Sequence, residues 1–190
     1  DLARFRDARV AGAVTKLELD RLIAAAPAQA RSLAETEGHF DAQVAVTRDH
    51  AEVPRVVLTV VPGPRARVTD VGIAIEGALL DAERAGDVGA IDTAAMLFEQ
   101  WPLQRGEPFT QSAWTSAKNG TLTRLQGAGY PLASWRSTSA KVDVAKTSVD
   151  LRLVADSGPL FRLGALRIVG LSRYDESVVF FLNDSATTEV

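Results

Sequence analysis

The sequence predicts an α+β fold in which one small domain occurs in tandem. Over the first forty residues, apolar side chains recur every three to four positions, which is typical of helices, and two short alternating stretches that are typical of strands follow. The same order of patterns then returns further along the chain. Each copy ends on an apolar strand that runs into a Gly-Pro pair, Gly63-Pro64 in the first and Gly158-Pro159 in the second.

The composition excludes several classes of protein. With 46% hydrophobic and 24% charged residues, the chain has the makeup of a globular domain, and its net charge of −3 offers no basic surface for nucleic acid. The absence of cysteine excludes disulfides, Cys-ligated zinc and thiol catalysis, and it suits an oxidising compartment such as the periplasm. No apolar run is long enough for a membrane-spanning helix. Because the chain begins at Asp1 without methionine, we expect a processed or truncated chain.

The pattern of the first copy predicts helical segments followed by a hairpin. Pro27 should kink or split the helical part, and Gly38 should end it. Residues 41–47 and 55–61 have the alternation of strands. The following Pro62-Gly63-Pro64 cannot continue a strand ladder, because proline lacks the donor N–H, and Gly63 can take the positive φ that a Pro-Gly turn needs.

The second copy begins with an alternating stretch at residues 67–75 that Gly77 ends. Residues 81–90 are small, acidic and contain glycine, so we expect a surface loop or a frayed turn there, with Asp92 as the N-cap of a short helix through Gln100. Thr110 should cap a longer helix that continues through Asn119-Gly120, because the apolar face stays in phase on both sides of that pair. Residues 133–144 and 148–155 then form a hairpin, and residues 161–169 resemble another first strand.

Glycines and prolines recur at the ends of the two copies with nearly constant spacing. Gly38-His39 matches Gly129-Tyr130 after the long helices, and Gly77 matches Gly170 at the ends of the first strands. We interpret these positions as residues with a structural role at the junctions between modules. The set comprises Pro62, Gly63, Pro64, Gly77, Gly129, Tyr130, Gly158, Pro159 and Gly170.

This repeat resembles the polypeptide-transport-associated (POTRA) domain, and within that superfamily it is most similar to the TamA family. The resemblance is carried by Val61-Pro62-Gly63, the stretch VGIAIEG, the pattern QxGEPFTxxxWxxxKxxxL from Gln104 to Leu122, Gly129-Tyr130 and SGPLFRLGALRIVG from Ser157. It implies βααββ modules, each a three-stranded mixed sheet with two helices on one face. The implied boundaries are 1–65 for a first module without its first strand, 66–160 for a complete second, and 161–190 for the start of a third.

The resemblance also implies a function. POTRA arrays are non-catalytic periplasmic parts of Gram-negative outer-membrane proteins, they need no cofactor or metal, and they precede a C-terminal β-barrel that this sequence does not contain. The implied partners are a TamB-like periplasm-spanning inner-membrane protein and unfolded outer-membrane protein or autotransporter clients. The implied function is to guide these clients toward insertion into the outer membrane.

The family's sheet order places the strand after the second helix at an edge, where unpaired N–H and C=O groups can accept an extended segment of another chain by β-augmentation. These edges would be residues 41–47 and 133–142, and a mid-strand residue such as Ser137 is expected to carry a free edge donor. Trp135 is the one large aromatic on the second edge. The candidate binding residues are Gln43, Ala45, Thr47, Ser134, Trp135, Arg136, Ser137, Thr138, Ser139 and Lys141.

Other functions remain open at this stage. The POTRA array of a BamA-like insertase or of a two-partner secretion pore would share these features. A periplasmic hydrolase has weaker support: the tetrapeptide TSAK occurs at 115–118 and 138–141, but the first copy has threonine where penicillin-recognising enzymes need serine, and their companion motifs are absent. His39 and His50 are too few and too far apart for a metal site.

Overall fold

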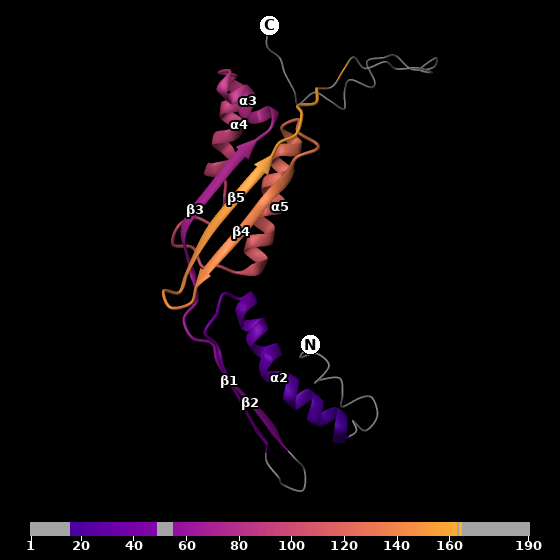
Figure 1. Ribbon diagram of the computed structural model, residues 1–190, viewed down its shortest axis with the longest axis vertical. Helices are drawn as coiled ribbons and strands as arrows, with labels where there is room; N and C mark the ends of the chain where they lie inside the picture. The colour runs from indigo at the N-terminus through magenta and orange to yellow at the C-terminus, as the bar shows by residue number, and fades with distance from the viewer. Residues whose placement is uncertain (1–15, 49–54, 163, 165–190) are drawn as a thin grey trace, which may run out of the picture. The chain divides into compact units, whose positions relative to one another are not determined.

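The computed structural model describes residues 16–48, 55–162 and 164 (Figure 1). The chain divides into two compact units, residues 1–160 and residues 161–190. Gly170 and the expected strand at 161–169 lie largely outside the described residues, so the fold below is that of the first unit.

The N-terminal part consists of helix α2 (Lys16–Thr36) and an antiparallel hairpin of β1 (Gln43–Arg48) and β2 (Val56–Val61). The helix runs through Pro27 without interruption, so the expected split is wrong. Proline lacks only its own N–H, and the hydrogen bonds on both sides of it can hold the helix together. Between α2 and the hairpin lies an apolar cavity of about 710 Å³, lined by residues that include Ile23, Leu33 and Leu58.

The rest of the unit is a mixed three-stranded sheet with helices. Strand β3 (Arg67–Glu76) is followed by α3 (Ala78–Arg84), α4 (Val88–Glu99), α5 (Gln111–Gly127), β4 (Ser134–Asp143) and β5 (Ser148–Asp156). The strand order is β3-β5-β4, with β5 parallel to β3 and antiparallel to β4. This confirms the predicted α+β class with a mixed sheet.

Residues 81–90, which the sequence predicted to be a loop, are mostly helical. They hold the end of α3 and the start of α4, joined at Gly86, whose φ is 82°. The N-cap of α4 is Asp87, whose carboxylate accepts a hydrogen bond from the Ala90 N–H at 2.9 Å, so Asp92 lies inside the helix. The glycines that suggested a loop mark a helix end and a first turn, where glycine is tolerated.

Helix α5 agrees with its prediction. The Thr110 hydroxyl accepts a hydrogen bond from the Ala113 N–H at 3.0 Å, which is the expected N-cap. The helix continues through Asn119 and Gly120 to Gly127. The inward face on either side of Gly120 stays buried, and this burial outweighs the roughly 1 kcal/mol that a glycine costs inside a helix.

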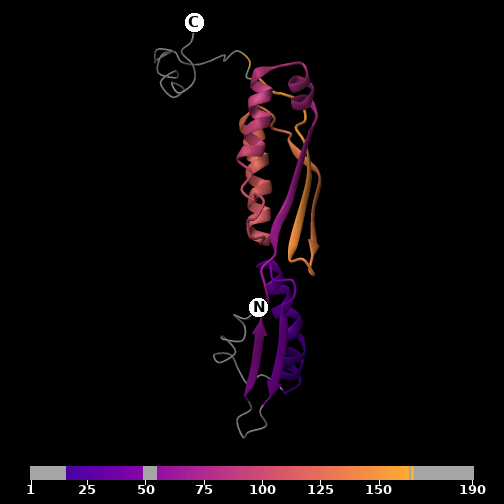
Figure 2. The same ribbon diagram turned by 90° about the vertical axis from the view of Figure 1, so that its left-hand side faces the viewer.

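The core lies on one face of the sheet. Alternate residues of β5 are fully or almost fully buried, and they pack with Trp101, Trp114 and Leu97 from the helical segment. In Figure 2 the helices lie on one side of the sheet, opposite a face that is left open. The buried residues of β5 are Val149, Leu151, Leu153 and Ala155.

The two predicted junctions have the same local geometry. Gly38 and Gly129 follow the long helices with φ of 87° and 96°, and Gly63 and Gly158 follow the last strands with φ of 70° and 63°. A Cβ at Gly63 would meet the residue at position 41, and one at Gly158 would meet the residue at position 132. The two predicted junctions therefore share positive φ angles at matching glycines.

Aromatic rings connect the first junction to the core of the sheet. The Ala66 N–H donates to the Gly38 carbonyl at 2.8 Å. Phe40 lies 6.2 Å from Phe109 between ring centroids, and Phe109 lies 6.4 Å from Trp114. Trp114 in turn packs edge-on against Trp101 at 6.1 Å, and both tryptophans are buried. Such pairs add about 0.5–1.5 kcal/mol beyond the area they bury.

Gly77 is a position where an added side chain should be costly. It has φ 85° and ψ −162°, a region open almost only to glycine, and a Cβ would lie 2.6 Å from Asp156 Oδ1 and 2.8 Å from Ser157 Oγ. The Ser157 hydroxyl accepts the Leu79 N–H there. We expect Gly77→Ala to lower the free energy of unfolding by about 2–4 kcal/mol in urea denaturation, as backbone strain and crowding combine.

Gly86 provides the matched control for this substitution. Its φ of 82° is similar, but no atom lies within 4 Å of the added Cβ. Gly86→Ala should cost only the strain of a left-handed residue, about 1–2 kcal/mol. Equal losses for the two variants would contradict the crowding at Gly77.

Candidate functional site

The central strand β5 determines which backbone groups of its neighbours are free. At its start, the Thr147 carbonyl accepts the Arg67 N–H at 3.0 Å, and just after its end the Ser157 N–H donates to the Glu76 carbonyl at 3.0 Å. The backbone groups of odd-numbered residues therefore face β3 at both ends. The register shifts place the extra residues in β3 and β4, so β5 alternates regularly and its even-numbered residues face β4.

This alternation assigns the two sides of β4. Ser137, which pairs with Val154, directs its N–H and C=O toward β5, and so do Ser139, Lys141 and Asp143, each of which pairs with an even-numbered residue of β5. The residues between them direct their backbone groups away from the sheet. The expectation that Ser137 carries a free edge donor is therefore wrong. The outward-facing residues are Thr138, Ala140 and Val142.

Most of the predicted β4 residues are exposed, and Trp135 differs from them. Its side chain is half-buried, packs against both parts of the core, and its indole N–H donates to the Lys118 carbonyl at 3.3 Å. This ring anchors β4 to α5 and is not free to hold a client. The exposed members of the predicted set are Ser134, Arg136, Ser137, Thr138, Ser139 and Lys141.

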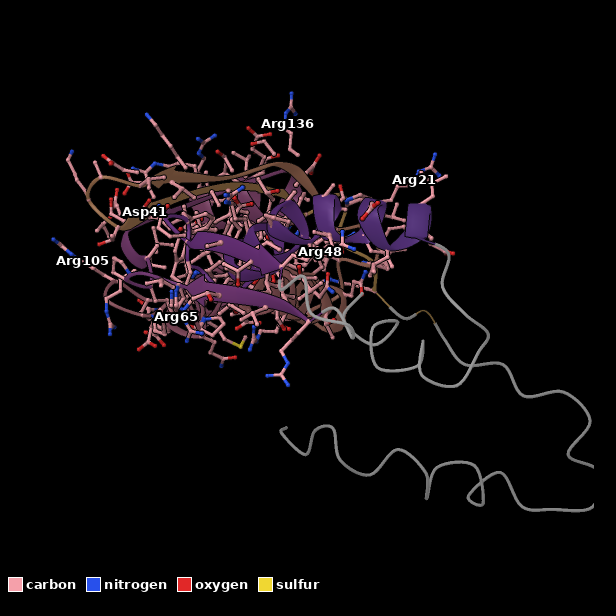
Figure 3. All side chains as sticks on the ribbon, turned by 90° about the horizontal axis from the view of Figure 1, so that it is seen from below. Arg21, Asp41, Arg48, Arg65, Arg105 and Arg136 are labelled. Carbon is pink, nitrogen blue, oxygen red and sulfur yellow. The ribbon has the colours of Figure 1, made fainter. Side chains whose placement is uncertain are left out.

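The β4 edge carries features that limit permanent association. The register shift between Trp135 and Ser137 makes Arg136 a bulge residue. Its side chain is 68% exposed, forms an ion pair with Glu76 at 3.1 Å and projects outward from the ribbon (Figure 3). Bulges and lysines such as Lys141 are common means of keeping an edge strand soluble. The regular part of the edge therefore begins after the bulge and runs to the end of β4.

The opposite edge of the sheet is partly covered by the chain itself. The Val68 N–H donates to the Glu107 carbonyl at 2.9 Å, and the Gly106 N–H donates to the Val68 carbonyl at 2.8 Å. Arg67 and Pro108 form an isolated antiparallel bridge next to these bonds. Within residues 55–162, no comparable loop pairs with the outer side of β4, which lies at the margin of the sheet in Figure 1.

The predicted residues of the first edge, Gln43, Ala45 and Thr47, are exposed on β1. In the part of the chain that the structure describes, β1 pairs only with β2. The candidate residues of β1 and β4 thus belong to separate sheets, and the structure does not bring them into one site.

The open face of the sheet is polar. Arg152 of β5 donates to Asp70 of β3 at 2.6 Å, and the Thr69 hydroxyl donates to Asp150 at 2.6 Å. The hydrogen bond from Arg152, and then its charge, lower the pKa of Asp70. The pKa of Asp143 is also lowered, chiefly by the hydrogen bond from the Lys146 N–H. Both carboxyls stay ionised to lower pH, which is the behaviour of surface ion pairs.

The described residues contain no group of three or more His, Cys, Asp or Glu side chains that could hold a metal ion. No helix among them is both long and apolar enough to cross a membrane. The chemistry that this surface does offer is backbone hydrogen bonding at the edge of β4.

No protein-family model matches the sequence, and no curated protein matches it. Among solved structures, the chain is similar to POTRA domains 3–5 of Haemophilus influenzae BamA, with 20% identity, a TM-score of 0.40, and coverage of 78% of this chain and 55% of that one. It is also similar to POTRA domains 1–2 of Omp85 from Anabaena, with 18% identity, a TM-score of 0.33, and coverage of 82% and 83%.

A third similar structure is BamA from Haemophilus ducreyi lacking POTRA domains 1–3, with 21% identity, a TM-score of 0.35, and coverage of 75% of this chain. The chain spans 23% of that structure and 55% of the Haemophilus influenzae fragment.

The Asp70 pair gives a testable pH dependence. Because the folded-state pKa of Asp70 is lowered, its contribution to stability is present above the carboxyl's ordinary pKa and is lost as the pH falls through the lowered value. Arg152→Gln should move the pKa of Asp70 upward toward the ordinary value of an aspartate carboxyl, as followed by the NMR shift of its carboxyl carbon. Lys146→Gln is the control and should leave Asp70 unchanged. An unmoved Asp70 pKa in Arg152→Gln would contradict this pairing.

Proposed function

We propose that this chain is a periplasmic tandem-POTRA region of a TamA-like outer-membrane protein, and that it binds extended segments of client polypeptides along the outer edge of β4. The module boundaries 1–65, 66–160 and 161–190 belong to this proposal. So do a TamB-like partner and outer-membrane protein or autotransporter clients, which rest on the sequence resemblance. In this proposal the chain is a scaffold without catalytic residues.

The observation that carries the proposal is the alternation along β4. Thr138, Ala140 and Val142 each present one N–H and one C=O outward over a regular stretch of strand. An added strand would use these groups for main-chain hydrogen bonds, which depend little on the client's side chains. This suits a protein that handles many unfolded sequences.

The side chains along the same strand support transient pairing. Ser137 and Ser139 project onto the open face of the sheet and are small, polar and exposed, so they neither block a neighbouring strand nor add a large apolar surface. The bulge at Arg136 limits how far pairing can extend. An edge of this kind can hold a client briefly and release it, as a step in assembly requires.

Two proline variants test the proposal. Thr138→Pro removes an outward donor and spares the β4–β5 ladder, whereas Ser137→Pro removes a donor that faces β5. As the probe we choose a synthetic peptide of about ten residues with the alternating apolar and polar pattern of a barrel strand. In NMR titrations, Thr138→Pro should weaken its binding by about fivefold or more, the equivalent of one hydrogen bond.

Ser137→Pro is the matched control for the fold. It should lower the free energy of unfolding by about 1–3 kcal/mol more than Thr138→Pro does, because it leaves a ladder acceptor unpaired. The proposal fails if Thr138→Pro is folded and binds the peptide as the unaltered chain does, or if the peptide perturbs residues other than those of β4.

A further inference from the structure

Helix α4 has a second apolar face that the fold does not use. Its inner face consists of Ala90, Ala94 and Leu97, which are 5%, 3% and 1% exposed and pack into the core. The apolar residues of the other face are spaced by three, four and three positions, which is the a/d spacing of a coiled-coil heptad. They are Val88, Ile91, Ala95 and Phe98.

These side chains are open to solvent. Val88 is 70% exposed, Ile91 43% and Phe98 44%, and Ala95 is also exposed. The inner face already anchors the helix, and the Asp87 cap satisfies its first turn, so nothing in the sheet or its core requires apolar residues here. A row of apolar side chains at this spacing on an exposed helix is a typical surface for another helix.

Acidic residues border this row. Asp92 and Glu99 are seven positions apart, one directly after Ile91 and the other directly after Phe98, which is the e position of each heptad. Both are exposed, and neither forms an ion pair with any residue that the structure describes. In coiled coils the charges at e and g positions select the partner. The face therefore carries negative charge without a counter-charge.

We propose that the outer face of α4 docks an amphipathic helix of a partner protein whose apolar side is bordered by lysine or arginine. The charge pattern selects this occupant. A second copy of the chain would bring two rows of Asp92 and Glu99 together, and an anionic lipid surface would be repelled by them. This site is distinct from the β4 edge, and its occupancy does not depend on client binding there.

The test uses the whole chain and two designed peptides of about three heptads, both with leucine at a and d positions. One peptide has lysine at its e and g positions and the other has glutamate. In NMR titrations the lysine peptide should perturb the amides of α4, and the glutamate peptide should bind at least about tenfold more weakly. Ile91→Ser and Phe98→Ser should each weaken binding of the lysine peptide by about tenfold through lost apolar burial.

A charge reversal distinguishes this proposal from non-specific binding of apolar peptides. The double variant Asp92→Lys with Glu99→Lys changes only exposed side chains and should remain folded by circular dichroism. It should reverse the preference and bind the glutamate peptide more tightly. Equal binding of both peptides, perturbations away from α4, an unreversed preference, or self-association of the chain through this face would each overturn the proposal.

Discussion

The position of β5 between β3 and β4 is the constraint on which the rest of the sheet depends. Its odd-numbered side chains form the buried layer beneath the helices, while the backbone groups of those residues pair with β3. Its even-numbered residues pair with β4. A strand with both edges occupied leaves no freedom of register, because a slip of one residue would expose the entire apolar set. The free groups on β4 follow directly from this arrangement.

Much of the fold could be predicted from sequence because it rests on local signals. The alternation in β5, the Thr110 cap and the repeated glycines are such signals, and all agree with the structure. Residues 81–90 were misread because Gly86 and Gly89 suggested a loop, and the N-cap of α4 is Asp87 and not the predicted Asp92. An N-cap residue can be identified from sequence only if the helix that follows it is identified. A short helix with acidic residues resembles a loop in composition.

The candidate site was predictable only in part. Exposure along β4 follows from its polar composition, and every predicted β4 residue except Trp135 is exposed. Which of them have free backbone groups depends on the bulge at Arg136 and on pairing with β5, and neither is encoded by the strand itself. The burial of Trp135 against α5 is likewise a tertiary effect, set by a carbonyl seventeen residues away along the chain. The outer face of α4 was missed because the predicted helix began after Asp92, which left Val88 and Ile91 outside it.

Amide hydrogen exchange measured residue by residue tests the central claim most directly. Without a ligand, the amides of Thr138, Ala140 and Val142 should exchange quickly, and those of Ser137, Ser139 and Lys141 should be protected by β5. Addition of an extended barrel-strand peptide should slow exchange in the first set and leave the second unchanged. Protection of Thr138, Ala140 and Val142 in the free chain, or slowing by the peptide elsewhere than β4, would contradict the account.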